Sequence, residues 1–368
     1  MVGLNPAGTG TPIGHVELST HMRTAPSVLV AGETLVDFLP AESGPLDDVD
    51  RFDRRPGGAP ANVAVGLAHL DSPPLFWTRV GDDPFGRFLA ATLADHGLPE
   101  RYFEFDPAAK TSLAFVTHDD TGDREFTFYR DGTADTRLEP GRIDDETLAA
   151  LEWVHVGGVT LATEPARTAT LDLVNRAADA GCTVSFDPNA RLELWESPET
   201  FRRVCREALA ATDVCKATAG ELELLGFEGE TPAALGEDVL AQAAGPQTVF
   251  VTRGSEGAVA VVSSGEGTDG VESEELPWVE TDPEQESGSG PLVVENAGRE
   301  VETVDTTGAG DAFVAGMISA LRDGVSIAAA LEFACAVAAI TTTERGAMTA
   351  MPDHETVVQF RAERSNRD

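Results

Sequence analysis

Short apolar runs alternate with amphipathic segments along most of this chain, and this alternation limits its fold more than any other feature. The runs are nearly continuous in apolar residues, which is typical of buried parallel strands. They lie at 28–32, 153–157, 183–187, 213–216 and 248–252. Segments with helical periodicity lie between them, several with Pro or Thr near the first turn. They span 84–96, 167–180, 198–211 and 232–243. The pattern predicts an α/β fold with a parallel sheet and helices on both faces.

Other segments break this rhythm. Residues 35–56 and 102–130 predict strands without intervening helices, with a hairpin turn at 119–123. They predict a small β layer that covers a site as a lid, or alternatively a solvent-exposed β extension without a gating role. Residues 1–26 predict a flexible N-terminal extension, followed by one domain over 27–363. Residues 263–298 are acidic, lack Lys and Arg, and predict a mobile loop.

The charge balance excludes two classes of partner. The chain has 26 basic and 63 acidic residues, a formal net charge of -37, and only two lysines, Lys110 and Lys216. Nucleic acids and anionic membranes require clustered cations, which this chain lacks. The acid excess favours adaptation to molar salt, and the alternative is a merely acidic protein. Its apolar stretches fall short of the roughly 20 residues that a membrane helix needs.

The compartment follows from the N-terminal residues and the cysteines. The first residues have neither the cationic start nor the apolar core of a secretory signal. The four cysteines form no CxxC pair and no zinc-finger spacing, so we expect buried, reduced thiols in a cytoplasmic protein.

Several enzyme signatures are missing from the sequence. Neither lysine lies in a P-loop, and there is no HExxH, no GxSxG and no HRD with DFG. The first strand is followed by Glu33, Thr34 and Leu35 rather than by the dinucleotide GxGxxG. The remaining candidates for ligand binding are glycine-rich segments elsewhere in the chain.

The segment 304–317 is the most informative of these. Gly308, Ala309 and Gly310 allow a sharp turn into a helix, whose first amides and dipole form a ready anion site. Asp311 falls in the first turn, where a carboxylate can accept the proton of an attacking hydroxyl. The alternative is that Asp311 only caps the helix.

A second segment, 57–68, also leads from a loop into a helix. Gly57 and Gly58 permit close approach of a ligand to the backbone, and the Asn62 amide can both donate to and accept from a polyol. The alternative is a tight turn with a capping Asn.

These two segments resemble the two signatures of the PfkB, or ribokinase-like, carbohydrate kinases. The first reads GGAPANVAVGLAHL at 57–70 and the second DTTGAGDAFVAGM at 305–317, in the family's order. The similarity runs from about residue 28 to 360. It implies a ribokinase-like three-layer α/β/α sandwich with a mostly parallel central sheet and a small β-sheet lid.

Within the family, the chain is most similar to fructokinases. The similarity lies in AGETLVDFLP (31–40), RVGDDPFG (79–86), REFTFYRDGTADTRL (124–138) and FDPNARLELW (186–195). It implies ATP-dependent phosphorylation of fructose. The enzymatic alternative is a 2-keto-3-deoxygluconate kinase, and the alternative of another class is a non-catalytic sugar sensor on a kinase scaffold.

The resemblance also implies roles for individual residues. Asp311 is the base, and Gly308, Ala309 and Gly310 stabilise the transferring phosphoryl group. The residues implied for the sugar are Asp37, Gly57, Gly58, Asn62, Arg130 and Arg191. Both arginines could instead form ordinary ion pairs.

The nucleotide and ion residues are implied in the same way. Those for ATP are Asn189, Lys216, Thr218, Glu221, Thr252, Gly254 and Gly257. Mg²⁺ is expected on the ATP phosphates and water, with Glu221 acting through solvent. The family often has Asn where this chain has Thr218. A monovalent cation, K⁺, is implied at Asp305, Thr307 and carbonyls of 341–350, including Gly346. The exposed lid edge predicts a homodimer through the lid.

Overall fold

The computed structural model describes residues 26–42, 44–118, 124–263 and 290–365. The predicted N-terminal extension therefore lies almost wholly outside the described residues, and so does the hairpin turn at 119–123.

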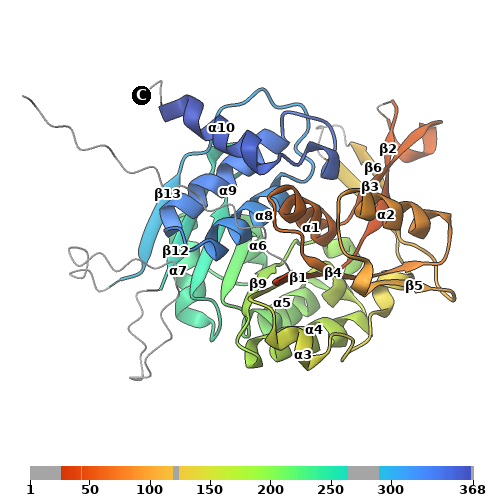
Figure 1. The fold of residues 1–368 in the computed structure, drawn as a ribbon, viewed down its shortest axis with the longest axis horizontal. Helices are drawn as coiled ribbons and strands as arrows, with labels where there is room; N and C mark the ends of the chain where they lie inside the picture. The colour runs from red at the N-terminus through yellow and green to blue at the C-terminus, as the bar shows by residue number, and fades with distance from the viewer. Residues whose placement is uncertain (1–25, 43, 119–123, 264–289, 366–368) are drawn as a thin grey trace, which may run out of the picture.

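A mostly parallel sheet of nine strands forms the centre of the molecule (Figure 1). Its spatial order is β13-β12-β11-β10-β9-β8-β1-β4-β5. The strands are β1 (Val28–Ala31), β4 (Leu75–Gly81), β5 (Phe103–Asp106), β8 (Trp153–Gly157), β9 (Thr183–Asp187), β10 (Val214–Thr218), β11 (Thr248–Thr252), β12 (Ala258–Val262) and β13 (Leu292–Asn296). Only β12 and β13 join it by antiparallel pairing. The predicted α/β fold with a parallel sheet is confirmed.

Helices cover both faces of this sheet, as Figure 1 shows. One face carries α1 (Ala59–His69), α8 (Ala309–Arg322) and α9 (Ile327–Thr341). The other carries α3 (Asp145–Ala149), α4 (Ala166–Asp179), α5 (Pro198–Leu209) and α7 (Pro232–Gln242). Three further helices are α2 (Pro84–Asp95), α6 (Ala219–Leu224) and α10 (His354–Ser365). Each face therefore buries its own hydrophobic core against the strands.

The helix starts follow the capping rules that predicted them. Asp83, Ser197 and Thr231 cap α2, α5 and α7 with side-chain hydrogen bonds, and a proline follows each cap. Such caps satisfy amides that have no partner inside the helix. The four predicted helices end within two residues of the observed ends, because apolar periodicity fixes the face but not the last turn.

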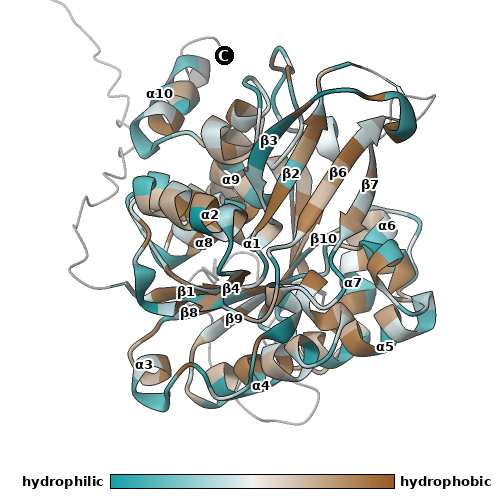
Figure 2. Ribbon diagram, turned by 90° about the vertical axis from the view of Figure 1, so that its right-hand side faces the viewer, coloured by the Kyte–Doolittle hydropathy of each residue, from teal (hydrophilic) through white to brown (hydrophobic). Residues whose placement is uncertain are grey.

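A second sheet of four strands, here called the lid, stands away from the main sheet (Figure 2). Its order is β3-β2-β6-β7, with β2 (Leu35–Pro40), β3 (Phe52–Gly57), β6 (Leu113–His118) and β7 (Arg124–Tyr129). The strand β3 passes directly into α1, so the lid is joined to a helix that packs on the main sheet.

The structure corrects two of the predicted boundaries. Residues 103–106 form β5 and pair with β4 in the main sheet, so the lid takes only the later part of 102–130. Residues 292–296, predicted as part of the acidic loop, form β13 and pair with β12. Val293 and Val294 are β-branched and favour a strand, a preference that the overall acidity of the segment obscured. Residues 264–289 lie outside the described residues. In the part of the chain that the structure describes, no helix is long and apolar enough to cross a membrane.

Candidate active site

Asp311 lies in the first turn of α8 and contacts the first turn of α1. Nδ2 of Asn62 donates a hydrogen bond to Oδ2 of Asp311 over 2.7 Å. Asn62 is buried and Asp311 is half-buried. The structure thus brings the two glycine-rich segments together, although they lie far apart in the sequence.

The turn before α8 requires glycine at its first position. Gly308 has φ of +78°, and a Cβ there would lie 2.6 Å from Cβ of Ala347. The Ala309 amide donates to the carbonyl of Thr306 over 3.3 Å. The Gly310 amide comes next, in the first turn, where a helix supplies no preceding carbonyl for its amides. The start of α8 can therefore receive an anion.

Burial raises the pKa of Asp311 to about 6. The hydrogen bond from Asn62 and the positive charges of Lys216 and Arg191 favour the ionised form, while the negative charge of Asp187 opposes it. A carboxylate with a pKa near neutrality is suited to accept a proton at physiological pH.

The wall beside Asp311 is built from the junction between β3 and α1. A Cβ on Gly57 would lie 2.0 Å from Oδ2 of Asp37, so the Asp37 carboxylate occupies that space. Gly58 has φ of +105°, and a Cβ there would lie 2.5 Å from the carbonyl oxygen of Glu33. Four predicted sugar residues, Asp37, Gly57, Gly58 and Asn62, therefore lie on one wall.

Arg130 follows β7 of the lid and is buried. Its Nε donates to Oδ2 of Asp135 over 2.5 Å. Asp135 also accepts hydrogen bonds from the hydroxyls of Ser112 and Thr133. The predicted alternative of an ion pair is thus realised, but Nη2 of Arg130 is buried without a hydrogen-bond partner among the described residues. Arg130 keeps one donor for a ligand.

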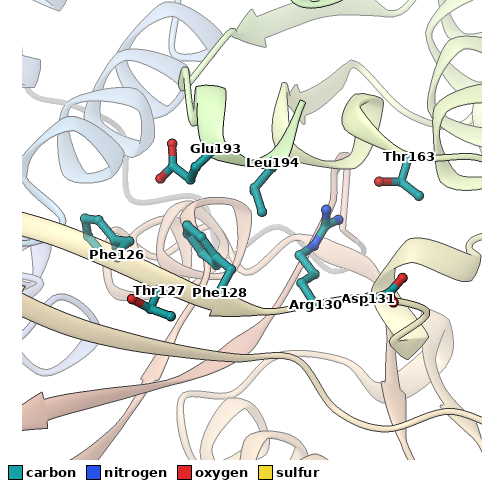
Figure 3. Close-up of a pocket in the computed structure, with 8 residues that line it drawn as sticks. All are labelled: Phe126, Thr127, Phe128, Arg130, Asp131, Thr163, Glu193 and Leu194. Carbon is teal, nitrogen blue, oxygen red and sulfur yellow. The ribbon is translucent and has the colours of Figure 1, made fainter. Parts of the chain in front are cut away.

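Arg130 also lines a cavity of about 430 Å³ between the lid and the loops that follow β8 and β9. The lining residues are Phe126, Thr127, Phe128, Arg130, Asp131, Thr163, Glu193 and Leu194. Figure 3 shows the Arg130 side chain extending from the lid toward the segment that carries Leu194. The volume is in the range of small-ligand pockets, but no residue of α8 lines it, so Asp311 is not part of its lining.

Arg191 connects the loop after β9 with the lid. Its guanidinium carbon lies 5.3 Å from the ring centroid of Phe126, a cation–π contact. Its Nη1 donates to the carbonyl of Ala190 over 2.9 Å. Its charge favours ionisation of Asp311, so Arg191 acts on the site electrostatically.

Lys216 places a buried positive charge beside the start of α8. Its Nζ lies 2.8 Å from Oδ2 of Asp187, and a Cβ on Gly310 would lie 3.3 Å from the same Nζ. Burial opposes the charged form of Lys216, but the carboxylates of Asp187 and Glu221 outweigh it and raise the pKa of Lys216. Lys216 is therefore a fixed cation next to the anion site.

Thr218 and Glu221 form the capping box of α6. The Thr218 hydroxyl accepts from the Glu221 amide, and Oε2 of Glu221 accepts from the Thr218 amide over 2.8 Å. Oε1 of Glu221 accepts from the amide of Ala190 over 2.8 Å. Burial works against ionisation of Glu221, but Lys216 and these donors lower its pKa overall. Both residues are thus held by local structure.

The remaining predicted nucleotide residues lie at the ends of neighbouring strands. Thr252 ends β11 opposite Thr218, which ends β10. Gly254 and Gly257 follow in a tight turn with φ of +61° and +81°, and a Cβ on Gly257 would lie 2.1 Å from the Asn296 carbonyl oxygen. In the loop after β9, Asn189 has φ of +40°, and its amide donates to Oδ1 of Asp187.

The three predicted cation residues lie together beside the glycine turn that precedes α8. They are Asp305, Thr307 and Gly346. Oδ1 of Asp305 accepts from the amide and hydroxyl of Thr307, over 3.0 and 2.6 Å. Oδ2 accepts from the Gly346 amide over 3.0 Å. Within the described ranges, no cluster of three or more His, Cys, Asp or Glu residues could hold a metal ion. A monovalent cation would therefore depend on backbone carbonyls for most of its ligands.

Sequence reasoning missed two acidic residues of this site, Glu33 and Asp187. Both are buried, and both stand where a buried strand ends: Asp187 is the last residue of β9, and Glu33 comes two residues after β1. In open α/β sheets, ligands bind at the carboxyl ends of the strands. The position of both residues at the ends of predicted strands could therefore have identified them as candidates for the site.

The chain is similar to known proteins over most of its length. The model of the pfkB family carbohydrate kinases matches residues 25–354. A probable chloroplastic fructokinase of Arabidopsis thaliana is 36% identical over 343 residues, which cover 90% of this chain and 82% of the relative. The fructokinase of Xylella fastidiosa with bound ATP has a TM-score of 0.73 at 29% identity, covering 92% of this chain and 98% of that one.

A second solved structure adds a sugar and an ion. A double mutant of the fructokinase of Vibrio cholerae O395, in a form with bound fructose, ADP and potassium ion, has a TM-score of 0.71 at 31% identity. It covers 92% of this chain and 99% of that one. The family model covers most of the chain, and the fold is the ribokinase-like α/β fold. This chain belongs to the pfkB family of carbohydrate kinases.

Proposed function

We propose that this protein is a fructokinase, which transfers the γ-phosphoryl group of ATP to a hydroxyl of fructose. The observation that carries the proposal is the half-buried Asp311, hydrogen-bonded to Asn62 at the start of α8 and close to the buried Lys216. The similarity to fructokinases over most of the chain supports the same substrate.

Asp311 accepts the proton of the sugar hydroxyl as the new oxygen–phosphorus bond forms and the bond to the ADP oxygen breaks. The glycine-rich turn of Gly308, Ala309 and Gly310 brings the positive end of α8 to the phosphoryl oxygens. Lys216 adds a full charge next to Gly310. Preorganised donors of this kind accelerate such reactions by about a hundredfold or more.

The sugar is held by the wall and the lid. Asp37 and Asn62 offer oxygen and nitrogen atoms to the hydroxyls, while Gly57 and Gly58 let the sugar approach the backbone. From the opposite side, Arg130 and Arg191 reach the sugar. Sites of this type discriminate well because a mispaired buried polar group is penalised.

ATP is bound along the ends of β9, β10 and β11. The residues for this role are Asn189, Lys216, Thr218, Glu221, Thr252, Gly254 and Gly257. Mg²⁺, when bound with ATP, neutralises charge on the phosphates. The carboxylates of Glu221 and Asp187 already accept hydrogen bonds from the chain, so they would contact the ion through water. K⁺ is proposed beside Asp305, Thr307 and Gly346, with the potassium in the Vibrio cholerae structure as support.

The biological setting is proposed from charge and cysteine burial. All four cysteines are buried free thiols, as expected in the reducing cytoplasm. The net charge of -37 favours function at molar salt. The domain is taken as residues 27–363, and its lid offers Tyr129, 59% exposed on the edge strand β7, as a surface for a homodimer.

The test is a panel of sugars assayed with ATP in molar KCl, with the product identified by NMR. Fructose should give the highest kcat/KM, and the NMR spectrum will assign the phosphate to C6 or C1. The rival is a 2-keto-3-deoxygluconate kinase, favoured by the spare Nη2 of Arg130, which could bind a carboxylate. A higher kcat/KM for that sugar acid than for fructose would make the sugar acid the substrate in place of fructose. Sugar binding without phosphate transfer would indicate a sensor.

A further inference from the structure

Three buried polar atoms without hydrogen-bond partners belong to residues that are connected around Asp311: Asn62 bonds to Asp311, and Glu33 lies in electrostatic range of both Asp311 and Arg130. The three atoms are Oε2 of Glu33, Oδ1 of Asn62 and Nη2 of Arg130, and none has a partner among the described residues. Native proteins pair nearly all buried polar atoms, because an unpaired one loses its hydration without compensation. Two acceptors and one donor left open in one region therefore point to a polar ligand.

Glu33 is the least expected of the three. It is 2% exposed and stands two residues after β1, with its carbonyl oxygen against Gly58. Burial raises the pKa of Glu33 to about 7, while the positive charge of Arg130 lowers it and the charges of Asp135 and Asp311 raise it. Glu33 thus lies within electrostatic range of both the lid and the start of α8.

Arg130 provides the complementary donor. Its Nε donates to Asp135, which fixes the orientation of the guanidinium, but its Nη2 has no hydrogen-bond partner among the described residues. No ion pair joins Glu33 directly to Arg130 in the described parts of the chain. A group that both donates and accepts can connect a carboxylate to a guanidinium, and a sugar hydroxyl does both.

We propose that Glu33 is a specificity-determining residue of the sugar site, where one hydroxyl donates to Oε2 of Glu33 and accepts from Nη2 of Arg130. This inference rests on the proposed sugar kinase function. It assigns Glu33 a direct contact with the substrate, on the side of the sugar that faces the lid.

The experiment compares the wild-type protein with Glu33→Ala and Glu33→Gln on fructose and on analogues that each lack one hydroxyl. In the wild type, removal of the bound hydroxyl should lower kcat/KM by about a hundredfold, because it leaves Glu33 and Arg130 unpaired. In Glu33→Ala, removal of the same hydroxyl should lower kcat/KM only a few-fold, since the carboxylate that binds this hydroxyl is already absent. Glu33→Gln keeps the shape and one acceptor, so the loss of kcat/KM on removal of the hydroxyl should lie between those of the wild type and Glu33→Ala. This variant also provides the test if the alanine variant does not fold.

Two readouts separate a contact from a structural role. The KM for ATP should be unchanged in both variants, and Glu237→Gln, which removes an exposed charge on α7, should match the wild type throughout. Equal penalties for every analogue in the wild type and in both variants would overturn the proposal, and would leave water as the bridging group. A wild-type protein that does not phosphorylate fructose would instead refute the proposed function.

Discussion

Nδ2 of Asn62 donates a 2.7 Å hydrogen bond to Oδ2 of Asp311, and this bond joins the first turn of α1 to the first turn of α8. A donor to a carboxylate favours its ionised form and fixes its orientation. The other end of the same amide, Oδ1, is buried and unpaired among the described residues. Asn62 therefore links the proposed base to the proposed sugar site.

Replacing Asp311 by Asn should abolish turnover and leave the fold intact. The amide has nearly the same shape but cannot accept the proton, so kcat should fall by about a hundredfold or more. Steady-state kinetics measure the loss, while calorimetric titration with ATP should give an affinity close to that of the wild type. Turnover within tenfold of the wild type would show that another group takes the proton.

The pH dependence of kcat/KM should report the pKa of Asp311. Burial raises this pKa to about 6, and the base must be deprotonated to act, so kcat/KM should fall as the pH drops below about 6. The Asn62 hydrogen bond lowers the pKa, so Asn62→Ala should move the acidic limb to higher pH. Profiles of both proteins, measured at constant ionic strength, test this shift. An unmoved limb would mean that Asn62 does not tune the base.

Lys216 is predicted to have both a structural and a catalytic role. Lys216→Met leaves Asp187 buried without its partner, and loss of one partner of a buried pair costs about 3–5 kcal/mol. The double variant Lys216→Met/Asp187→Asn removes both charges and should regain most of the melting temperature. It should still turn over at least about tenfold more slowly than the wild type, because the cation beside Gly310 is gone. Recovery of both properties together would make Lys216 purely structural.

The two ends of α8 provide a matched test of the glycine turn. Gly308 and Gly324 have similar positive φ values, +78° and +72°. A Cβ at Gly308 would lie 2.6 Å from Cβ of Ala347, whereas at Gly324 nothing lies within 4 Å. Gly324→Ala should cost about 1 kcal/mol of stability through backbone strain alone. Gly308→Ala should cost about 3 kcal/mol and most of the activity, because the clash displaces the start of the helix. Equal effects in denaturant titrations and assays would contradict this reasoning.

The sequence predicted five of the nine strands of the main sheet and four of its helices, because apolar periodicity and capping residues act locally, but it did not predict β4 and β12. It also singled out Asp311 and Asn62 in two glycine-rich segments, and the structure brings these two residues into contact. Local patterns do not show which sheet a strand joins, so β5 was placed in the lid although it pairs with β4. The strand β13 was missed for another reason, because it lies within a segment whose overall acidity predicted a loop.

The parts of the site that escaped prediction depend on long-range contacts. The backbone of Glu33 packs closely against the β3–α1 junction at Gly58, a contact that local sequence patterns do not reveal. Asp187 meets Lys216 only because β9 and β10 are neighbours in the sheet. Arg130 was predicted, but its pairing with Asp135 and its spare Nη2 follow from the fold of the lid.

Stability should rise steeply with salt concentration. The chain carries a formal net charge of -37, and its self-repulsion acts over about 10 Å at 0.1 M salt but only about 3 Å at 1 M. Screening therefore stabilises the compact folded state more than the expanded unfolded chain. Melting temperatures measured from dilute buffer to molar KCl should climb continuously. Sucrose, which stabilises proteins without screening charge, should not reproduce the low-salt part of the rise. A flat response to KCl would show that the acidic surface does not limit stability, and would remove the reason to assay the enzyme in molar salt.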